Sequence, residues 1–143
     1  MKKQIAFRVQ DSLPPKKDGA ASMWAKSAEI PRLIALRKAA LEAMGSNTPL
    51  RRNITLKLTI YYSKQELVRA GDLDNFITGV CDGLMAANPG IKKHPRWSDA
   101  KLDTIKPDVT VAIADDSEVI SIHATKTGTE NGVWYDVVLE GET

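Results

Sequence analysis

The sequence has a single cysteine and no long apolar run, and each absence limits what the chain can be. Cys81 has no second cysteine with which to form an internal disulfide, which favours the reducing cytoplasm as its location. No apolar stretch approaches the roughly 20 residues needed to span a bilayer, so a membrane partner is not expected. The first residues alternate between apolar and polar side chains, unlike the continuous apolar core of a signal peptide.

Common signatures of catalysis and binding are also missing. There is no internal repeat, no Gly-rich phosphate loop, no zinc-ligand spacing and no Ser/His/Asp or Cys/His arrangement in a credible local context. The composition is that of an ordinary globular protein, with 43% hydrophobic and 27% charged residues. A chain of 143 residues fits one domain, residues 1–143, with a core of its own.

The net charge of +2 points to no particular partner, but the basic residues are unevenly distributed. They dominate the N-terminal third, whereas acidic residues gather later in the chain. A basic face beside an acidic pocket suits a metal-dependent enzyme that acts on a polyanion. Ordinary solvated charges on helices and loops are the alternative interpretation. The basic residues of the N-terminal third are Lys2, Lys3, Arg8, Lys16, Lys17, Lys26, Arg32, Arg37, Lys38, Arg51 and Arg52.

Hydrophobic periodicity predicts an α+β fold, with a small mixed or antiparallel sheet and two main helices. The last two predicted strands are joined through Asn131-Gly132, which indicates an antiparallel hairpin. Residues 88–112 show little periodicity and are predicted to be a long irregular loop, functional or mobile. The predicted strands cover residues 3–10, 53–62, 118–125 and 132–139, and the predicted helices cover 31–44 and 74–86.

Two pairs of acidic residues stand out. Asp72 and Asp74 lie in Gly-Asp-Leu-Asp-Asn, and Asp115 and Asp116 lie in Ala-Asp-Asp-Ser. Each pair sits at a junction between predicted elements, where side chains can converge on one point. Clusters of carboxylate oxygens bind Mg²⁺, and two-metal sites activate water and stabilise the leaving oxygen of a phosphodiester. The structural alternatives are a helix cap for the first pair and turn chemistry for the second.

The order of these motifs resembles the RusA family of Holliday-junction resolvases. The resemblance spans nearly the whole chain apart from residues 88–112, which are predicted to be a family-atypical insertion. It also includes a Pro-Pro loop followed by lysines near the N-terminus. The residues that carry it are Pro14-Pro15, Asp72-Leu73-Asp74-Asn75, Asp82-Gly83-Leu84, Asp115-Asp116-Ser117-Glu118-Val119 and Ile122-His123-Ala124-Thr125-Lys126.

This resemblance implies a Mg²⁺-dependent endodeoxyribonuclease that cuts four-way junctions and other branched DNA in recombination and repair. It also implies a homodimer that nicks the two-fold symmetric junction symmetrically. The implied catalytic and metal-binding residues are Asp72, Asp74 and Asp116, with Asp115 as an adjacent metal ligand. The candidate contacts to DNA phosphates are Lys16, Lys17, Lys26 and Lys126.

One position departs from the family pattern. The family has a catalytic lysine four residues after the second aspartate of the motif, where this chain has Thr78. Lys101, Lys106 and Lys126 are candidates to replace it. The alternative is a protein of the same fold that binds branched DNA and has lost cleavage.

Two further functions are weighed against these. An Asp-x-Asp motif also begins the haloacid-dehalogenase phosphatase signature, but there it follows a buried strand, whereas here it follows a polar loop. A purely structural module would leave the clustered carboxylates unexplained. Among the other residues, Trp24 and Trp97 lie near lysines and are candidates to stack on bases. His94 is expected to be a solvated or phosphate-contacting loop residue, and His123 is expected to project to the polar or active-site face of its strand; neither is expected to bind a metal.

Overall fold

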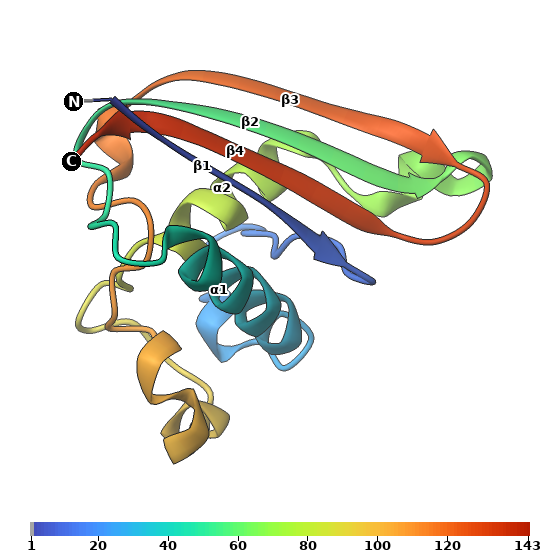
Figure 1. The fold of residues 1–143 in the computed structure, drawn as a ribbon. Coiled ribbons are helices and arrows are strands. Elements are labelled where there is room, and N and C mark those ends of the chain that lie inside the picture. The colour runs from blue at the N-terminus through green and yellow to red at the C-terminus, as the bar shows by residue number, and fades with distance from the viewer. Residues whose placement is uncertain (1) are drawn as a thin grey trace.

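The computed structural model describes residues 2–143 and shows a four-stranded sheet with helices packed against one face (Figure 1). The sheet is mixed, because β2 and β3 run parallel whereas β4 runs antiparallel to both β1 and β2. This architecture confirms the predicted α+β class with two main helices. The main elements are β1 (Lys2–Gln10), α1 (Ile30–Met44), β2 (Arg52–Ser63), α2 (Leu73–Leu84), β3 (Val119–Thr129) and β4 (Trp134–Glu142).

Short 3₁₀ helices occupy several of the connections. Within residues 2–143, none of the helices combines the length and the apolar character that crossing a bilayer requires. The 3₁₀ helices are η1 (Met23–Ala25), η2 (Lys64–Ala70), η3 (Pro95–Ser98), η4 (Ala100–Ile105) and η5 (Asp116–Glu118).

The predicted hairpin between the last two strands is wrong, because β2 lies between β3 and β4 in the strand order β1-β4-β2-β3. The connection at residues 130–133 carries the chain past the end of β2 instead of forming a tight turn between neighbours. The inward side chains of β4 are Tyr135, Val137 and Leu139, and all three are buried. β3 is exposed along most of its length. The strand with the larger apolar side chains therefore takes the central place, where burial is greatest.

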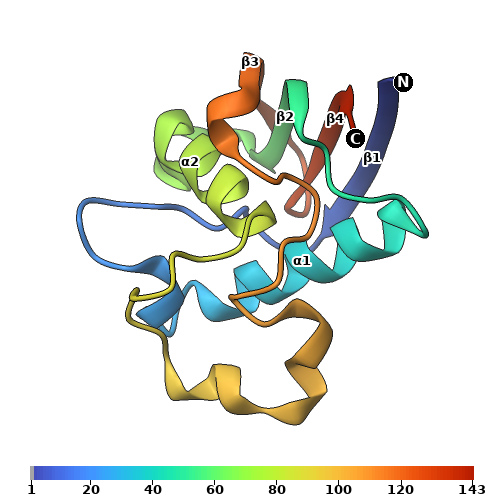
Figure 2. The same cartoon turned by 90° about the vertical axis from the view of Figure 1, so that its left-hand side faces the viewer.

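The helix α2 returns the chain from the end of β2 to the start of β3, and this crossover makes the two strands parallel. Both α-helices lie on the same side of the sheet (Figure 2). The core forms where the covered face of β2, including Leu56 and Leu58, meets Phe76 and Val80 of α2. The opposite face of the sheet carries no helix (Figure 2).

Residues 88–112 are packed, in contrast to the irregular loop that the sequence predicts. Trp97, Leu102 and Ile105 are buried in a second apolar cluster with Trp24 and Leu33. The two tryptophan rings lie 5.5 Å apart, and the indole N–H of Trp97 donates to the Trp24 carbonyl at 3.0 Å. Because Trp24 and Trp97 are only 2% and 4% exposed, the expectation that they stack on bases is wrong.

A fully buried arginine, Arg37 on α1, joins this second cluster to α2. Its Nη1 donates to the carbonyls of Gly83 and Met85 at 2.6 and 3.0 Å, at the end of α2. Nε donates to the Ile105 carbonyl at 2.8 Å, and Nη2 donates to the carbonyls of Lys106 and Val109. All five guanidinium N–H groups are thereby used. Burial lowers the pKa of Arg37 to about 10, and nearby Asp108 opposes this decrease.

We expect Arg37→Met to destabilise the protein by at least about 3 kcal/mol, because several buried carbonyls lose their only charged donor. Urea denaturation followed by circular dichroism measures the loss. Lys38→Ala is the matched control, since Lys38 is the exposed neighbour on the same helix and its removal should change little. Equal stability of Arg37→Met and Lys38→Ala would contradict the structural role given to Arg37.

Candidate carboxylate site along helix α2

The predicted acidic motif lies at the start of α2. Gly71 precedes it with φ 134°, and a side chain there would collide with the ring of Phe76 at 2.9 Å. Asp72 occupies the N-cap position, yet its carboxylate accepts no hydrogen bond from the helix. The capping alternative therefore does not account for Asp72. Asp72 and Asp74 are both exposed to solvent.

The exposed face of α2 carries further polar side chains beyond this motif. Asp74, Thr78 and Asp82 follow each other at intervals of one helical turn. Thr78 cannot serve as a cation, and its hydroxyl donates back to the Asp74 carbonyl at 3.0 Å. Asp82 is half-buried and also lines a small pocket with Trp24, Met85 and Asn88. Asp82 is not among the site residues that the sequence predicts, although its spacing of eight residues from Asp74 is the signal that could have found it.

The second acidic motif lies against the other end of α2. The backbone N–H of Asp116 donates to the sulfur of Met85 at 3.1 Å, which fixes η5 beside the helix. Asp115 caps η5, with its Oδ1 accepting from the N–H of Ser117 at 2.9 Å. This backbone hydrogen bond and a further one from the Ser117 hydroxyl lower the pKa of Asp115. The predicted turn role thus holds for Asp115, while Asp116 faces solvent.

Asp82 and Asp116, which are far apart in the sequence, influence each other electrostatically. Burial raises the pKa of Asp82, the negative charge of Asp116 raises it further, and Lys17 lowers it. The site therefore contains two mutually repelling carboxylates with a lysine nearby. A bound cation would relieve this repulsion.

The predicted carboxylates form two pairs rather than one cluster. Asp72 and Asp74 lie at the N-terminal end of α2, whereas Asp116 lies beside its C-terminal end. A helix rises by about 1.5 Å per residue, so Asp74 and Asp82 are separated by roughly 12 Å along the axis. In the described part of the chain, no three His, Cys, Asp or Glu side chains are close enough together to hold a metal ion.

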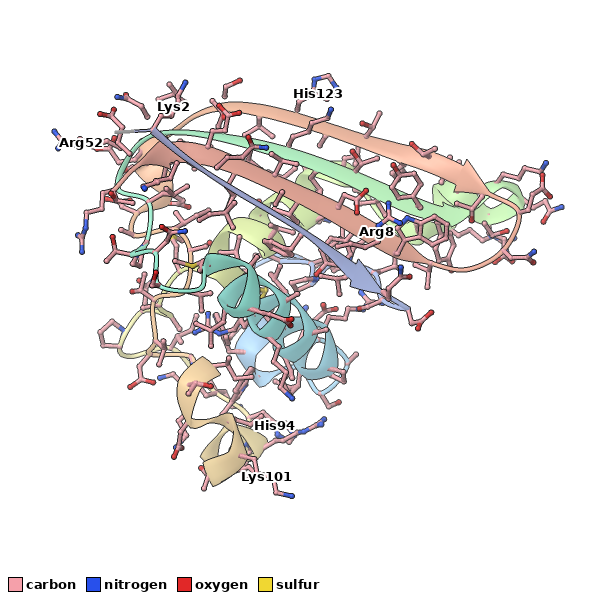
Figure 3. All side chains as sticks on the ribbon, in the orientation of Figure 1. Lys2, Arg8, Arg52, His94, Lys101 and His123 are labelled. Atoms are coloured by element: carbon pink, nitrogen blue, oxygen red, sulfur yellow. The ribbon has the colours of Figure 1, made fainter. Side chains whose placement is uncertain are left out.

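The three lysines considered as substitutes for the family lysine lie in different places. The ammonium group of Lys126 donates to the Gly71 carbonyl at 2.9 Å, next to Asp72. Lys106 forms an ion pair with Asp103 at 2.8 Å within the 88–112 segment. Lys101 lies at the end of the molecule farthest from the sheet (Figure 3). Of the three, Lys126 is the one held against the acidic motif.

The N-terminal Pro-Pro loop lies across α2 and carries the predicted phosphate contacts. A side chain at Gly79 would come within 2.0 Å of the Pro15 carbonyl, so this close approach requires glycine. The backbone N–H of Lys17 donates to the Asn75 carbonyl at 3.1 Å, and that of Lys16 donates to the buried carboxylate of Glu29 at 3.0 Å. The loop is thereby fixed beside the acidic face.

The side chains of this loop are tied to its own backbone. The ammonium group of Lys17 donates to the carbonyls of Gly19 and Ala21 at 3.0 and 2.7 Å. That of Lys26 lies 3.4 Å from the Asp18 carbonyl. These lysines remain partly accessible to solvent. Lys17 is the one whose charge reaches the carboxylates, through its effect on Asp82.

The two histidines lie away from these carboxylates. His123 projects from β3 on the open face of the sheet (Figure 3). His94 caps η3, with its Nδ1 accepting from the N–H of Arg96 at 3.0 Å. Cys81 is buried in the main core. Comparison with known proteins gives no matching family model and no matching curated protein.

The interaction between Asp82 and Asp116 predicts a specific pH dependence. Because the pKa of Asp82 is raised, its ionisation costs more free energy in the folded state than in the unfolded state. This cost appears as the pH rises through the unfolded-state pKa of 3.8. The stability of Asp82→Asn relative to the wild type should therefore increase as the pH is raised from acidic to neutral. Urea denaturation across that range, in EDTA, measures the difference.

A carboxyl titration by NMR provides the control for this prediction. In Asp116→Asn, the pKa of Asp82 should fall towards its ordinary value, because one repelling charge is gone while burial remains. Glu42→Gln, an exposed acidic position on α1, should leave the titration of Asp82 unchanged. An Asp82 pKa that does not respond to Asp116→Asn would show that the two carboxylates do not interact.

Proposed function

We propose that the protein is a Mg²⁺-dependent endodeoxyribonuclease that resolves Holliday junctions or other branched DNA, acting as a homodimer in recombination and repair in the cytoplasm. The observation that carries the proposal is the position of Asp116. This residue comes from a distant part of the chain to lie beside α2, where it interacts with Asp82 and where Lys17 is also near. The RusA-like order of the motifs supports the same conclusion.

The side chains along α2 have the chemistry that Mg²⁺ requires. Mg²⁺ prefers carboxylate and water oxygens, and it is commonly held by one or two carboxylates together with substrate phosphates. Asp72 and Asp74 would hold an ion at the N-terminal end of α2, and Asp82 and Asp116 would hold one at the C-terminal end. When bound, the ion would polarise the phosphodiester and activate water. The solvent-exposed carboxylates of Asp72, Asp74 and Asp116 leave room for water and phosphate ligands.

The remaining roles fall to the lysines. Lys126 lies beside Asp72 and would stabilise negative charge that develops on the phosphate oxygens, in place of the family lysine lost at Thr78. Lys16, Lys17 and Lys26 would bind neighbouring phosphates from the loop that crosses α2. Binding that depends on such contacts weakens as salt concentration rises.

A protein that binds branched DNA without cutting it is the second candidate. Two observations favour it: Thr78 turns its hydroxyl to the helix backbone, and the carboxylates stand in two separate pairs. In this alternative the basic loop would still bind phosphates, but no metal-dependent turnover would follow.

A cleavage assay separates the two candidates. With Mg²⁺, we expect symmetric nicks in a labelled four-way junction and none in a matched linear duplex, and EDTA should abolish them. Asp74→Asn and Asp116→Asn should each reduce the cleavage rate at least about 100-fold, because each removes a metal ligand. Glu42→Gln, at an exposed position on α1, should cut at the wild-type rate.

Junction binding is measured in parallel by gel shift. Tight binding without nicks would support the non-cleaving alternative. Neither binding nor cleavage would contradict the proposal. Binding by the aspartate variants at wild-type strength would confirm that their loss of cleavage does not come from misfolding.

The role of Lys126 gives a second test. Lys126→Met should slow junction cleavage by about 100-fold or more while junction binding falls much less, because a group that stabilises developing charge acts mainly in the transition state. Lys101→Met is the matched control and should leave the cleavage rate unchanged. Equal rates for the two variants would remove Lys126 from the mechanism and leave Lys106 to be tested in the same way.

A further inference from the structure

The 88–112 segment carries the net positive charge of the chain. It contains five lysines and arginines against three aspartates, so its net charge of +2 equals that of the whole protein. Asp99 accepts a hydrogen bond from the backbone N–H of Lys101 at 3.0 Å. Asp103 forms its ion pair with Lys106, so two of the three aspartates are engaged within the segment. Within residues 2–143, the cations of the segment that form no ion pair include Lys92, Lys93 and Arg96.

An open pocket of about 360 Å³ lies in this segment, between η3 and the turn that follows η4. Trp97 and two prolines give it apolar walls. Pockets of this size, with a few polar groups on apolar walls, are typical of ligand sites. The lining residues whose side chains can donate hydrogen bonds are Lys93, His94, Ser98 and Lys106.

One acidic residue, Asp108, lines the same pocket, and two cations balance its charge. The hydrogen bond with Asp103 raises the pKa of Lys106, and the charge of Asp108 raises it further. Burial lowers the pKa of Arg37, and the charge of Asp108 opposes this decrease. Because Asp108 is compensated in this way, Lys93 gives the pocket an excess of positive charge.

The wall formed by η3 is fixed in place without a ligand. The hydroxyl of Ser22 donates to the Lys92 carbonyl at 2.7 Å, and the backbone N–H of His94 donates to the Trp24 carbonyl at 2.9 Å. Nδ1 of His94 accepts from the N–H of Arg96, so the neutral imidazole carries its proton on Nε2. The ring therefore keeps a free N–H donor while its other nitrogen holds the ring in place.

We propose that this pocket binds a phosphate group of the DNA backbone, so that residues 88–112 form a second DNA contact in addition to α2 and the loop across it. Lys93 and Lys106 pair with the phosphate oxygens, and His94 and Ser98 donate hydrogen bonds to them. The pocket is too large for a phosphate ion alone. Its apolar walls suit the sugar that follows each phosphate along a DNA strand.

The position of the segment suits a DNA arm that leaves the carboxylate site. Asn88 lines the small pocket that Asp82 also lines, so the segment begins beside that site. The segment then projects away from the sheet, and His94 lies at this end of the molecule (Figures 1 and 3). The choice of DNA as the source of the phosphate rests on the proposed function, whereas phosphate binding by the pocket does not.

The first test measures affinity for a four-way junction and for a linear duplex by fluorescence anisotropy, in EDTA and at several salt concentrations. Lys93→Gln should weaken binding of both DNAs roughly 10-fold and reduce the slope of log affinity against log salt by about 1, because one phosphate contact is lost. Lys93→Gln/Lys106→Gln should reduce this slope by about 2, with unchanged circular dichroism.

Lys38→Gln/Lys57→Gln is the matched control for the double variant. It removes the same charge from exposed positions on α1 and β2, and it should leave the slope unchanged. Equal slopes for the two double variants would overturn the second DNA contact, and so would a wild-type protein that binds neither DNA.

The second test uses inorganic phosphate and adenosine monophosphate without DNA, followed by NMR of the backbone N–H groups. Phosphate should shift the signals of His94, Ser98 and Lys106, whereas sodium chloride of equal ionic strength should not, and Lys93→Gln/Lys106→Gln should abolish the shifts. Equal shifts with chloride would overturn the pocket as a phosphate site. Shifts with the nucleotide but none with a short duplex would overturn DNA as the source of the phosphate.

The outcomes for this pocket and for the nuclease are separable. Junction cleavage by a protein whose pocket variants bind DNA at wild-type strength would support the nuclease and overturn the second contact. Binding of phosphate and duplex at the pocket by a protein that cuts no junction would support the pocket and contradict only the proposed cleavage.

Discussion

The guanidinium group of Arg37 is the interaction on which the arrangement of the site depends. It is fully buried, and within residues 2–143 no carboxylate forms an ion pair with it; backbone carbonyls accept from all of its donors. Carbonyls at the C-terminal end of a helix carry partial negative charge, so the end of α2 is a favourable partner for a buried cation. Trp24 adds its ring face at 5.2 Å from the guanidinium carbon. Burial of a charge is tolerated here because every hydrogen bond is made.

This buried cation explains how residues 88–112 affect a site that they do not form. The segment leaves the end of α2, packs a small core around Trp97, and returns to the same place, where Arg37 holds both of its ends. The chain then passes directly to Ile113, which bridges to Leu50, and on to Asp116. The position of Asp116 beside Asp82 therefore depends on the way in which the segment is closed.

The acidic face of α2 and the open edge of β3 belong to one βαβ unit. Because α2 crosses back beneath the sheet, each end of the helix lies near one end of β3: Lys126 meets Gly71 at one end, and Asp116 meets Met85 at the other. The lysine-bearing loop approaches the same helix at Gly79, where only glycine fits. Basic and acidic groups that the sequence separates are thus brought to a single surface.

The sequence by itself determined the α+β class, the two helices, the positions of all four strands and the acidic motifs, because local periodicity and turn residues act over a few positions. Tertiary structure alone decided the place of β4 between β1 and β2, the burial of Trp24 and Trp97, and the association of Asp82 with Asp116. Strand order follows from which apolar face gains most by burial, and charge pairs follow from how distant segments pack. Both depend on contacts between residues far apart in the chain, which local sequence patterns do not encode.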